Sequence, residues 1–138
     1  MNRLTDEGHA AGLIGYVNGE PVGWVSVGPR PEFGRILRSP IAKVPREEAA
    51  DTSVWSVVCF YIPRQRRRQG VGRAMLDQAV AYARRRGAAR LEGYPVDTGG
   101  RRIPSNSIYV GTLDLFLAAG FRRVARHGAG RPVVTLAL

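Results

Sequence analysis

A short stretch rich in glycine and arginine decides the fold of this chain: Arg67-Arg68-Gln69-Gly70-Val71-Gly72-Arg73-Ala74. It lies between two segments of different character. Residues 54–62 form a continuous apolar and aromatic run, and its length and β-branching predict a strand buried on both faces. Residues 70–86 repeat apolar side chains at helical spacing, and Gly87 stands where a left-handed C-terminal cap belongs. The stretch is therefore a turn from a buried strand into a helix.

The segments on either side extend this unit. Residues 89–96 predict a second strand, so that residues 54–96 form a right-handed β-α-β crossover. Upstream, the β-rich runs 13–17 and 22–27 are joined by Asn18-Gly19, a strong hairpin signal. Downstream, we expect a shorter helix, capped by Ser105 or Ser107, and two closing strands. These three elements span residues 108–119, 121–126 and 133–138.

The order of these elements predicts the fold class. Three strands, a helix, a strand, a helix and two strands form an α/β protein with a mixed sheet, arranged as a three-layer sandwich. We expect one domain over residues 1–138. The first ten residues are polar, and we expect residues 1–10 to be flexible.

Composition excludes several functions. Lys43 is the single lysine among 21 basic residues, so the other 20 are arginines, and the formal net charge is +10. A Walker phosphate loop needs a Gly-Lys-Ser/Thr run, which Lys43 does not provide. Two histidines and the single Cys59 are too few for a His/Cys zinc site, so we expect no metal. The lone cysteine and the lack of a long apolar run favour a cytoplasmic protein without a membrane span.

The turn at Gly70 predicts a site for a phosphorylated ligand. The first turn of a helix has unpaired N–H groups and a partial positive charge, and glycine lets a phosphate approach the backbone. Arginines cluster there, at positions 64, 66, 67, 68 and 73. A dinucleotide fingerprint would need a small residue where this chain has Met75. A plain strand-to-helix connection is the alternative to a phosphate site.

The same residues resemble a known family. Arg67-x-x-Gly70-x-Gly72 after a hydrophobic strand is similar to the acyl-CoA motif, Gln/Arg-x-x-Gly-x-Gly/Ala, of the GNAT N-acetyltransferases. The hairpin before the β-α-β unit and the helix ending in Ala119-Gly120-Phe121 resemble the rest of that fold, over residues 11–138. The resemblance implies an enzyme that transfers an acetyl group from acetyl-CoA directly to a primary amine in a ternary complex.

The resemblance also implies how the co-substrate is bound. The pyrophosphate would bind backbone N–H groups of the turn, and the Arg67 side chain would help to hold that loop. The residues that would supply these N–H groups are Arg68, Gln69, Gly70, Val71, Gly72 and Arg73. The pantetheine arm would lie like an added strand against the backbone of Phe60, Tyr61 and Ile62, where an N–H group would polarise the thioester carbonyl.

The catalytic acid and base are less clear. Where many family members have a tyrosine that protonates the leaving thiolate, this chain has Phe116. Tyr109 is the nearest substitute, with packing or contact to pantetheine as its alternative role. A thiolate can also leave unprotonated. Glu92 and Asp97 are candidate bases; a salt bridge to an arginine is the alternative for Glu92. If Glu92 is the base, replacing it with Gln is expected to flatten the acid limb of the pH–rate profile.

The beginning of the chain departs from the family pattern. Family members usually have a strand and one or two helices before the hairpin, and residues 1–10 are too few to hold them. Either the start codon was placed late or this is a reduced form of the family. A reduced form predicts a bare edge at strand 13–17 and an uncovered apolar sheet face, and therefore a homodimer over that surface.

Two other functions stay open. One is a GNAT-like protein that binds CoA without catalysis, suggested by Phe116 and the short beginning. The other is a nucleic-acid-binding module that uses residues 64–68 and 84–86. These arginine clusters lie at opposite ends of one helix and lack interleaved aromatic residues, which disfavours nucleic acid. The sequence does not identify the amine.

Overall fold

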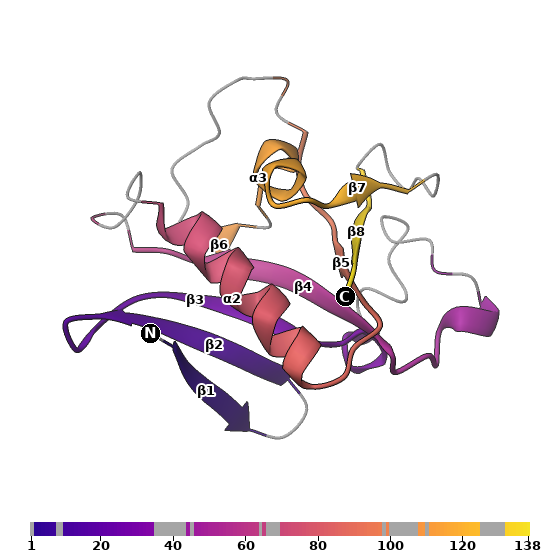
Figure 1. Ribbon diagram of the computed structural model, residues 1–138, viewed down its shortest axis with the longest axis horizontal. Helices are drawn as coiled ribbons and strands as arrows, with labels where there is room; N and C mark the ends of the chain where they lie inside the picture. Colours follow the sequence, from indigo (N-terminus) through magenta and orange to yellow (C-terminus); the bar gives the residue numbers. More distant parts are fainter. Residues whose placement is uncertain are drawn as a thin grey trace.

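The computed structural model describes residues 2–7, 10–34, 44, 46–63, 65, 70–97, 99, 108–109, 111–124 and 132–138. Its centre is an eight-stranded mixed sheet (Figure 1) with strand order β1-β2-β3-β4-β5-β8-β7, in which β6 also pairs with β4. The strands are β1 (Asn2–Glu7), β2 (Ala10–Val17), β3 (Glu20–Pro29), β4 (Val54–Tyr61), β5 (Arg90–Gly93), β6 (Ile108–Tyr109), β7 (Arg122–Arg123) and β8 (Val134–Ala137). The helices are α2 (Val71–Arg85) and α3 (Leu113–Ala118), with 3-10 turns η1 (Arg30–Glu32) and η2 (Arg46–Glu48). The predicted α/β fold with a central β-α-β unit is confirmed.

Strand β1 lies within the first ten residues, where the sequence predicted no strand. It pairs antiparallel with β2, from Asn2↔Gly15 to Glu7↔Ala10. The edge of β2 that we expected to be bare is therefore covered, and β1 forms the edge of the sheet instead. A polar sequence can form this strand because its neighbour supplies the backbone partners, which hydrophobic periodicity does not report.

The predicted hairpin is confirmed. Asn18 (φ 52°) and Gly19 (φ 81°) form its two-residue turn, and both have the positive φ that such turns favour. The flanking strands β2 and β3 extend beyond the predicted runs. β5, β7 and β8, in contrast, are shorter than the strands predicted at their positions.

Helix α2 lies across one face of the sheet (Figure 1) and buries a single apolar stripe against it. The buried residues of this stripe are Met75, Leu76, Ala79, Tyr82 and Ala83. They join residues of β2, β3, β4 and β5 in the main core. The helix ends as predicted: Gly87 has φ 85°, and the Ala88 N–H donates to the Ala83 carbonyl at 3.0 Å.

The segment after β5 differs from the prediction. Residues Ile108–Tyr109 form β6, and helix α3 begins only at Leu113. Its cap is Thr112, whose hydroxyl accepts a hydrogen bond from the Leu115 N–H at 3.2 Å. Neither predicted cap, Ser105 or Ser107, serves this helix, and both lie outside the described residues.

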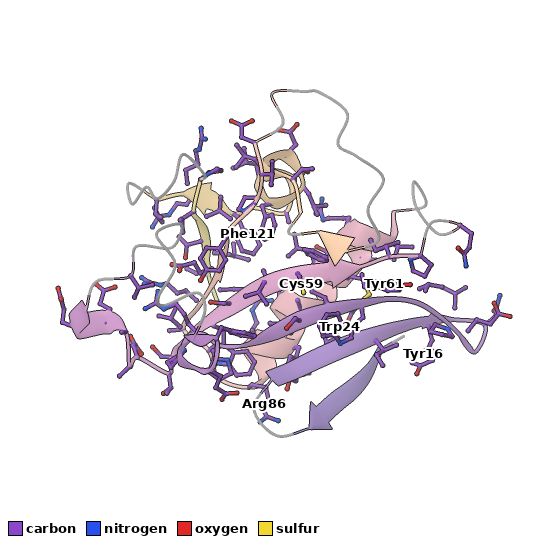
Figure 2. The ribbon with its side chains drawn as sticks, turned by 180° about the vertical axis from the view of Figure 1, so that it is seen from behind. Tyr16, Trp24, Cys59, Tyr61, Arg86 and Phe121 are labelled. Carbon is purple, nitrogen blue, oxygen red and sulfur yellow. The ribbon has the colours of Figure 1, made fainter. Side chains whose placement is uncertain are left out.

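The other face of the sheet carries a smaller cluster. Tyr94 and Val133 are its buried members, packed against residues of β4 and of the neighbouring loops. Further along the sheet, Trp24 pairs in register with Tyr61 across β3 and β4, and Figure 2 shows both side chains with Cys59 from behind. Within the described residues, no helix is long and apolar enough to cross a membrane.

The Phe116 side chain packs α3 against the sheet. Its ring is fully buried and lies between two glycines: a Cβ on Gly93 would come within 2.5 Å of its Cε1, and one on Gly111 within 2.8 Å of its Cε2. The ring also makes edge-on contacts with Phe60 and Phe121, with centroid distances of 6.3 and 5.0 Å. The aromatic ring at position 116 therefore requires both glycines.

We expect Gly93→Ala to lower the free energy of unfolding by about 1–3 kcal/mol, because the new methyl group overlaps the Phe116 ring. Urea unfolding measures this loss. The double variant Gly93→Ala/Phe116→Leu should lose less stability than the sum of the two single variants, because the smaller side chain makes room. Additive losses would contradict the contact.

Candidate functional site

Helix α2 begins on a left-handed glycine, and its first amides have no partner within the helix. Gly70 is the N-cap, with φ 77° and ψ 10°, and no side chain caps the helix. The first helical hydrogen bond runs from the Ala74 N–H to the Gly70 carbonyl at 3.1 Å, so the amides of Val71, Gly72 and Arg73 precede it. The first turn of α2 contains no acidic residue. These amides and the helix dipole together favour an anion at this end.

Arg73 adds a cation to this turn. Its Nε donates to Asp77 at 3.0 Å, and the two side chains are 46% and 54% exposed. An exposed pair of this kind contributes only about 0.3–0.5 kcal/mol, so it does not prevent Arg73 from turning to an anion. The described part of the predicted phosphate turn, Gly70, Val71, Gly72 and Arg73, thus lies together. The predicted residues Arg67, Arg68 and Gln69 lie outside the described residues.

A β-bulge shapes β4. Its pairing with β3 passes from Ser26↔Cys59 to Val27↔Val57, which leaves Val58 without a partner in this register. The extra residue changes which face the following side chains point to. Val57 and Phe60, three positions apart, therefore both lie buried in the main core.

At the bulge, β4 also changes its neighbour. It runs parallel to β5 only as far as Val57↔Gly93. Beyond this point Phe60 and Tyr61 pair with β6 on that edge, and with β3 on the other (Figure 1). Of the backbone that was predicted to bind pantetheine, Phe60 and Tyr61 therefore have a strand on each side.

The structure places the other predicted residues of this region as follows. Phe60 and Ile62 are buried, whereas Tyr61 is 41% exposed. The prediction that Tyr109 lies on the helix is wrong, because its backbone is in β6 opposite Phe60. Its side chain lies outside the described residues, so its role as an acid stays a prediction.

Glu92 belongs to a buried network. Its carboxylate is 1% exposed and accepts hydrogen bonds from Arg30 Nη1, at 3.3 and 3.4 Å to its two oxygens, and from the Tyr94 hydroxyl at 2.9 Å. Arg30 is fully buried, and its Nη2 donates to the Glu48 carbonyl at 3.1 Å. Because Tyr94 donates its proton to Glu92, the Ser56 hydroxyl donates to the Tyr94 oxygen, across 2.8 Å. Burial, and then the charge of Glu92, raise the pKa of Tyr94 well above its usual value.

The network bears on the predicted base. A salt bridge was the alternative role of Glu92, and the structure contains it. Asp97, the other candidate, is exposed, and its Oδ2 lies 3.6 Å from Arg123 Nη2. The role of Glu92 as a base stays a prediction. Among the described residues, no group of three His, Cys, Asp or Glu side chains could hold a metal ion.

Sequence reasoning missed Arg30 and Tyr94. The available signal was a carboxylate in an apolar strand, since a buried charge needs a partner. That signal does not say which of 20 arginines supplies the partner.

The mixed sheet, with β4, α2 and β5 as its central β-α-β unit, defines an α/β protein. A family model described as "Acetyltransferase (GNAT) family" matches residues 2–99. The chain therefore belongs to the GNAT family of N-acetyltransferase enzymes, and its general activity is acyl transfer.

Solved structures support this fold. The chain is 18% identical to a ribosomal-protein-alanine N-acetyltransferase from Brucella melitensis, with a TM-score of 0.59 over 94% of this chain and 69% of that one. The chain is 18% identical to the GNAT domain of S. lividans PAT, with a TM-score of 0.63 over 97% of this chain and 65% of that one. It is 10% identical to the PaiA N-acetyltransferase from Thermoplasma acidophilum in complex with coenzyme A, with a TM-score of 0.58 over 92% of this chain and 60% of that one. No curated protein matches the sequence.

Two matched variants test Glu92 as the base. Glu92→Gln and Arg30→Gln each leave a buried charge without its partner, and each should lose about 3 kcal/mol of stability. We expect only Glu92→Gln to flatten the acid limb of the pH–rate profile, because only this variant removes the group that must be deprotonated. The profiles are compared at a temperature where both variants are folded. An acid limb retained in Glu92→Gln, or lost equally in Arg30→Gln, would contradict the role.

Proposed function

We propose that the protein transfers an acetyl group from acetyl-CoA to a primary amine of a small molecule or a protein, directly within a ternary complex. The start of α2 carries this proposal. Three consecutive amides precede the first helical hydrogen bond, in a turn without a carboxylate and beside Arg73. A diphosphate suits such a turn. The coenzyme A bound to the Thermoplasma relative supports the same class of donor.

In this proposal the pantetheine arm lies between β4 and β5, where the two strands separate after Val57↔Gly93. Its amide groups would bind the β4 backbone at Phe60, Tyr61 and Ile62, as an added strand does. A main-chain N–H there would donate to the thioester oxygen and stabilise the negative charge that forms on it.

The reaction needs one bond to form and one to break. The amine nitrogen attacks the thioester carbonyl carbon, the C–N bond forms, and the C–S bond breaks as CoA leaves as a thiolate. The acceptor ammonium first gives a proton to a base, because only the neutral amine has the lone pair that attacks. The nitrogen then loses a second proton to solvent as the C–S bond breaks. Glu92 is enclosed, so a proton would reach it by way of the Tyr94 hydroxyl, to which the Ser56 hydroxyl is bonded in turn. Asp97 is exposed and could accept the proton directly or through water.

Two further parts of the proposal concern the setting of the reaction. We propose a cytoplasmic location and a homodimer. The homodimer does not rest on a bare edge of β2, because β1 covers that edge.

Thermal unfolding with acetyl-CoA tests the donor site. At about 100 times Kd the ligand adds about 2.7 kcal/mol to the free energy of unfolding and raises the Tm by several degrees. We expect Gly72→Glu to abolish this rise, because it puts bulk and negative charge where the phosphates bind. Ala50→Glu, which adds the same charge at an exposed turn after η2, should keep it. No rise in the native protein would overturn the proposal.

Release of the CoA thiol across a panel of amines tests turnover. Acetyl-CoA binding together with amine-dependent thiol release is the expected result. Binding with no release for any small amine, amino acid or peptide N-terminus would instead favour a CoA-binding protein without catalysis.

A further inference from the structure

The edge of β4 that faces β5 has two partners in succession. β5 pairs with it as far as Val57, and β6 then pairs with Phe60 and Tyr61. The proposed pantetheine arm needs the backbone groups of this same short edge. Since the backbone groups of one strand edge can bond to only one neighbouring strand at a time, β6 and the arm compete for it.

β4 and β5, between which the proposed arm lies, are each held by several contacts. β4 pairs with β3 from Trp55 to Tyr61, and β5 lies between β4 and β8. Tyr94, directly after β5, is tied back to β4 through the Ser56 hydroxyl and to the buried Glu92–Arg30 pair. Separating these groups would leave a charge buried without its partner, which costs several kcal/mol. We therefore do not expect β4 and β5 to move apart when the arm binds.

In the described residues, β6 has less backbone pairing than β4 or β5. It is two residues long, and in the described register it pairs with β4 alone. Short pairings of this kind open at a small fraction of the free energy that unfolds a whole domain. Of the strands that pair with β4, β6 is therefore the one that we expect to open most easily.

Gly111 lies two residues beyond the end of β6. Its carbonyl accepts a hydrogen bond from the Val96 N–H at 3.0 Å, and the Leu113 N–H donates to the Val96 carbonyl at 2.9 Å. These bonds anchor the start of α3 to the chain that continues from β5. Gly111 itself has φ 88°, which favours glycine and makes it a suitable hinge between the anchored residues and β6.

We propose that β6 occupies the place of the pantetheine arm in the free protein, and that acyl-CoA displaces it by rotation at Gly111. β6 is then an internal competitor that closes the donor site until the co-substrate arrives. This inference rests on the proposed function, because it takes the β4 edge as the binding site of the arm. The affinity for CoA is lowered by the fraction of molecules in which β6 is open.

Hydrogen exchange of the native protein, followed by NMR residue by residue with and without CoA, tests this. CoA should slow exchange at Val71, Gly72 and Arg73 and speed it at Ile108 and Tyr109. The Phe60 and Tyr61 amides should stay as protected as before, because the arm replaces β6. Slower exchange at α2 with β6 unchanged would overturn the displacement and leave the proposed function intact. No change at α2 would overturn both.

A pair of variants gives a second, independent test. Ile108→Pro disfavours β6 because proline cannot donate to a ladder, whereas Ile108→Ala keeps the backbone N–H. If β6 is open in about a tenth of the molecules, Ile108→Pro should tighten CoA binding about tenfold by calorimetry, and Ile108→Ala should change it little. An unchanged or weaker affinity of a folded Ile108→Pro protein would overturn the proposal. If that variant does not fold, the exchange experiment on the native protein decides.

Discussion

Each edge of a buried strand must find partners for its backbone groups, and the way β4 meets this requirement organises the whole protein. One edge is paired with β3. The other is divided: β5 pairs with its first half and β6 with its end, and the bulge at Val58 lies at the change. The chain that leaves β4 leads into α2, whose first amides precede the first helical hydrogen bond. The turn that we propose to bind an anion and the divided edge therefore both lie next to β4.

The buried pair of Arg30 and Glu92 has a different task. Arg30 follows β3 directly, and its guanidinium binds Glu92 on β5 and the carbonyl of Glu48. One cation therefore connects the two ends of the excursion between β3 and β4 to the centre of the sheet. Replacing such a pair by apolar side chains is often neutral for stability, so its value lies in defining one arrangement. The Nε of Arg30 is buried without a partner among the described residues.

The parts of the fold that sequence predicted are those with local causes. The turn at Asn18-Gly19, the cap at Gly87 and the helix start at Gly70 each depend on a residue that accepts a positive φ, and each was found. β1 was missed because its polar sequence forms a strand only through its neighbour. The start of α3 was placed too early because several hydroxyl residues precede it and nothing local chooses between them. Arg30 lies 62 positions from Glu92, and no local pattern reports such a pair.

Phe116 raises the question of whether the proposed transfer needs an acid at all. Its ring is enclosed between two glycines and presents no hydroxyl. An alkyl thiol such as cysteine has a pKa of about 8.5, so at neutral pH a thiolate lies only about 1.5 pH units from equal protonation, or about 2 kcal/mol. The protein has a net charge of +10, and all but one of its basic residues are arginines. This charge favours an anion nearby but transfers no proton to it. In the proposed transfer, carbonyl polarisation and a positive surface would therefore let the thiolate leave unprotonated, and an acid such as Tyr109 would add rate rather than make the reaction possible.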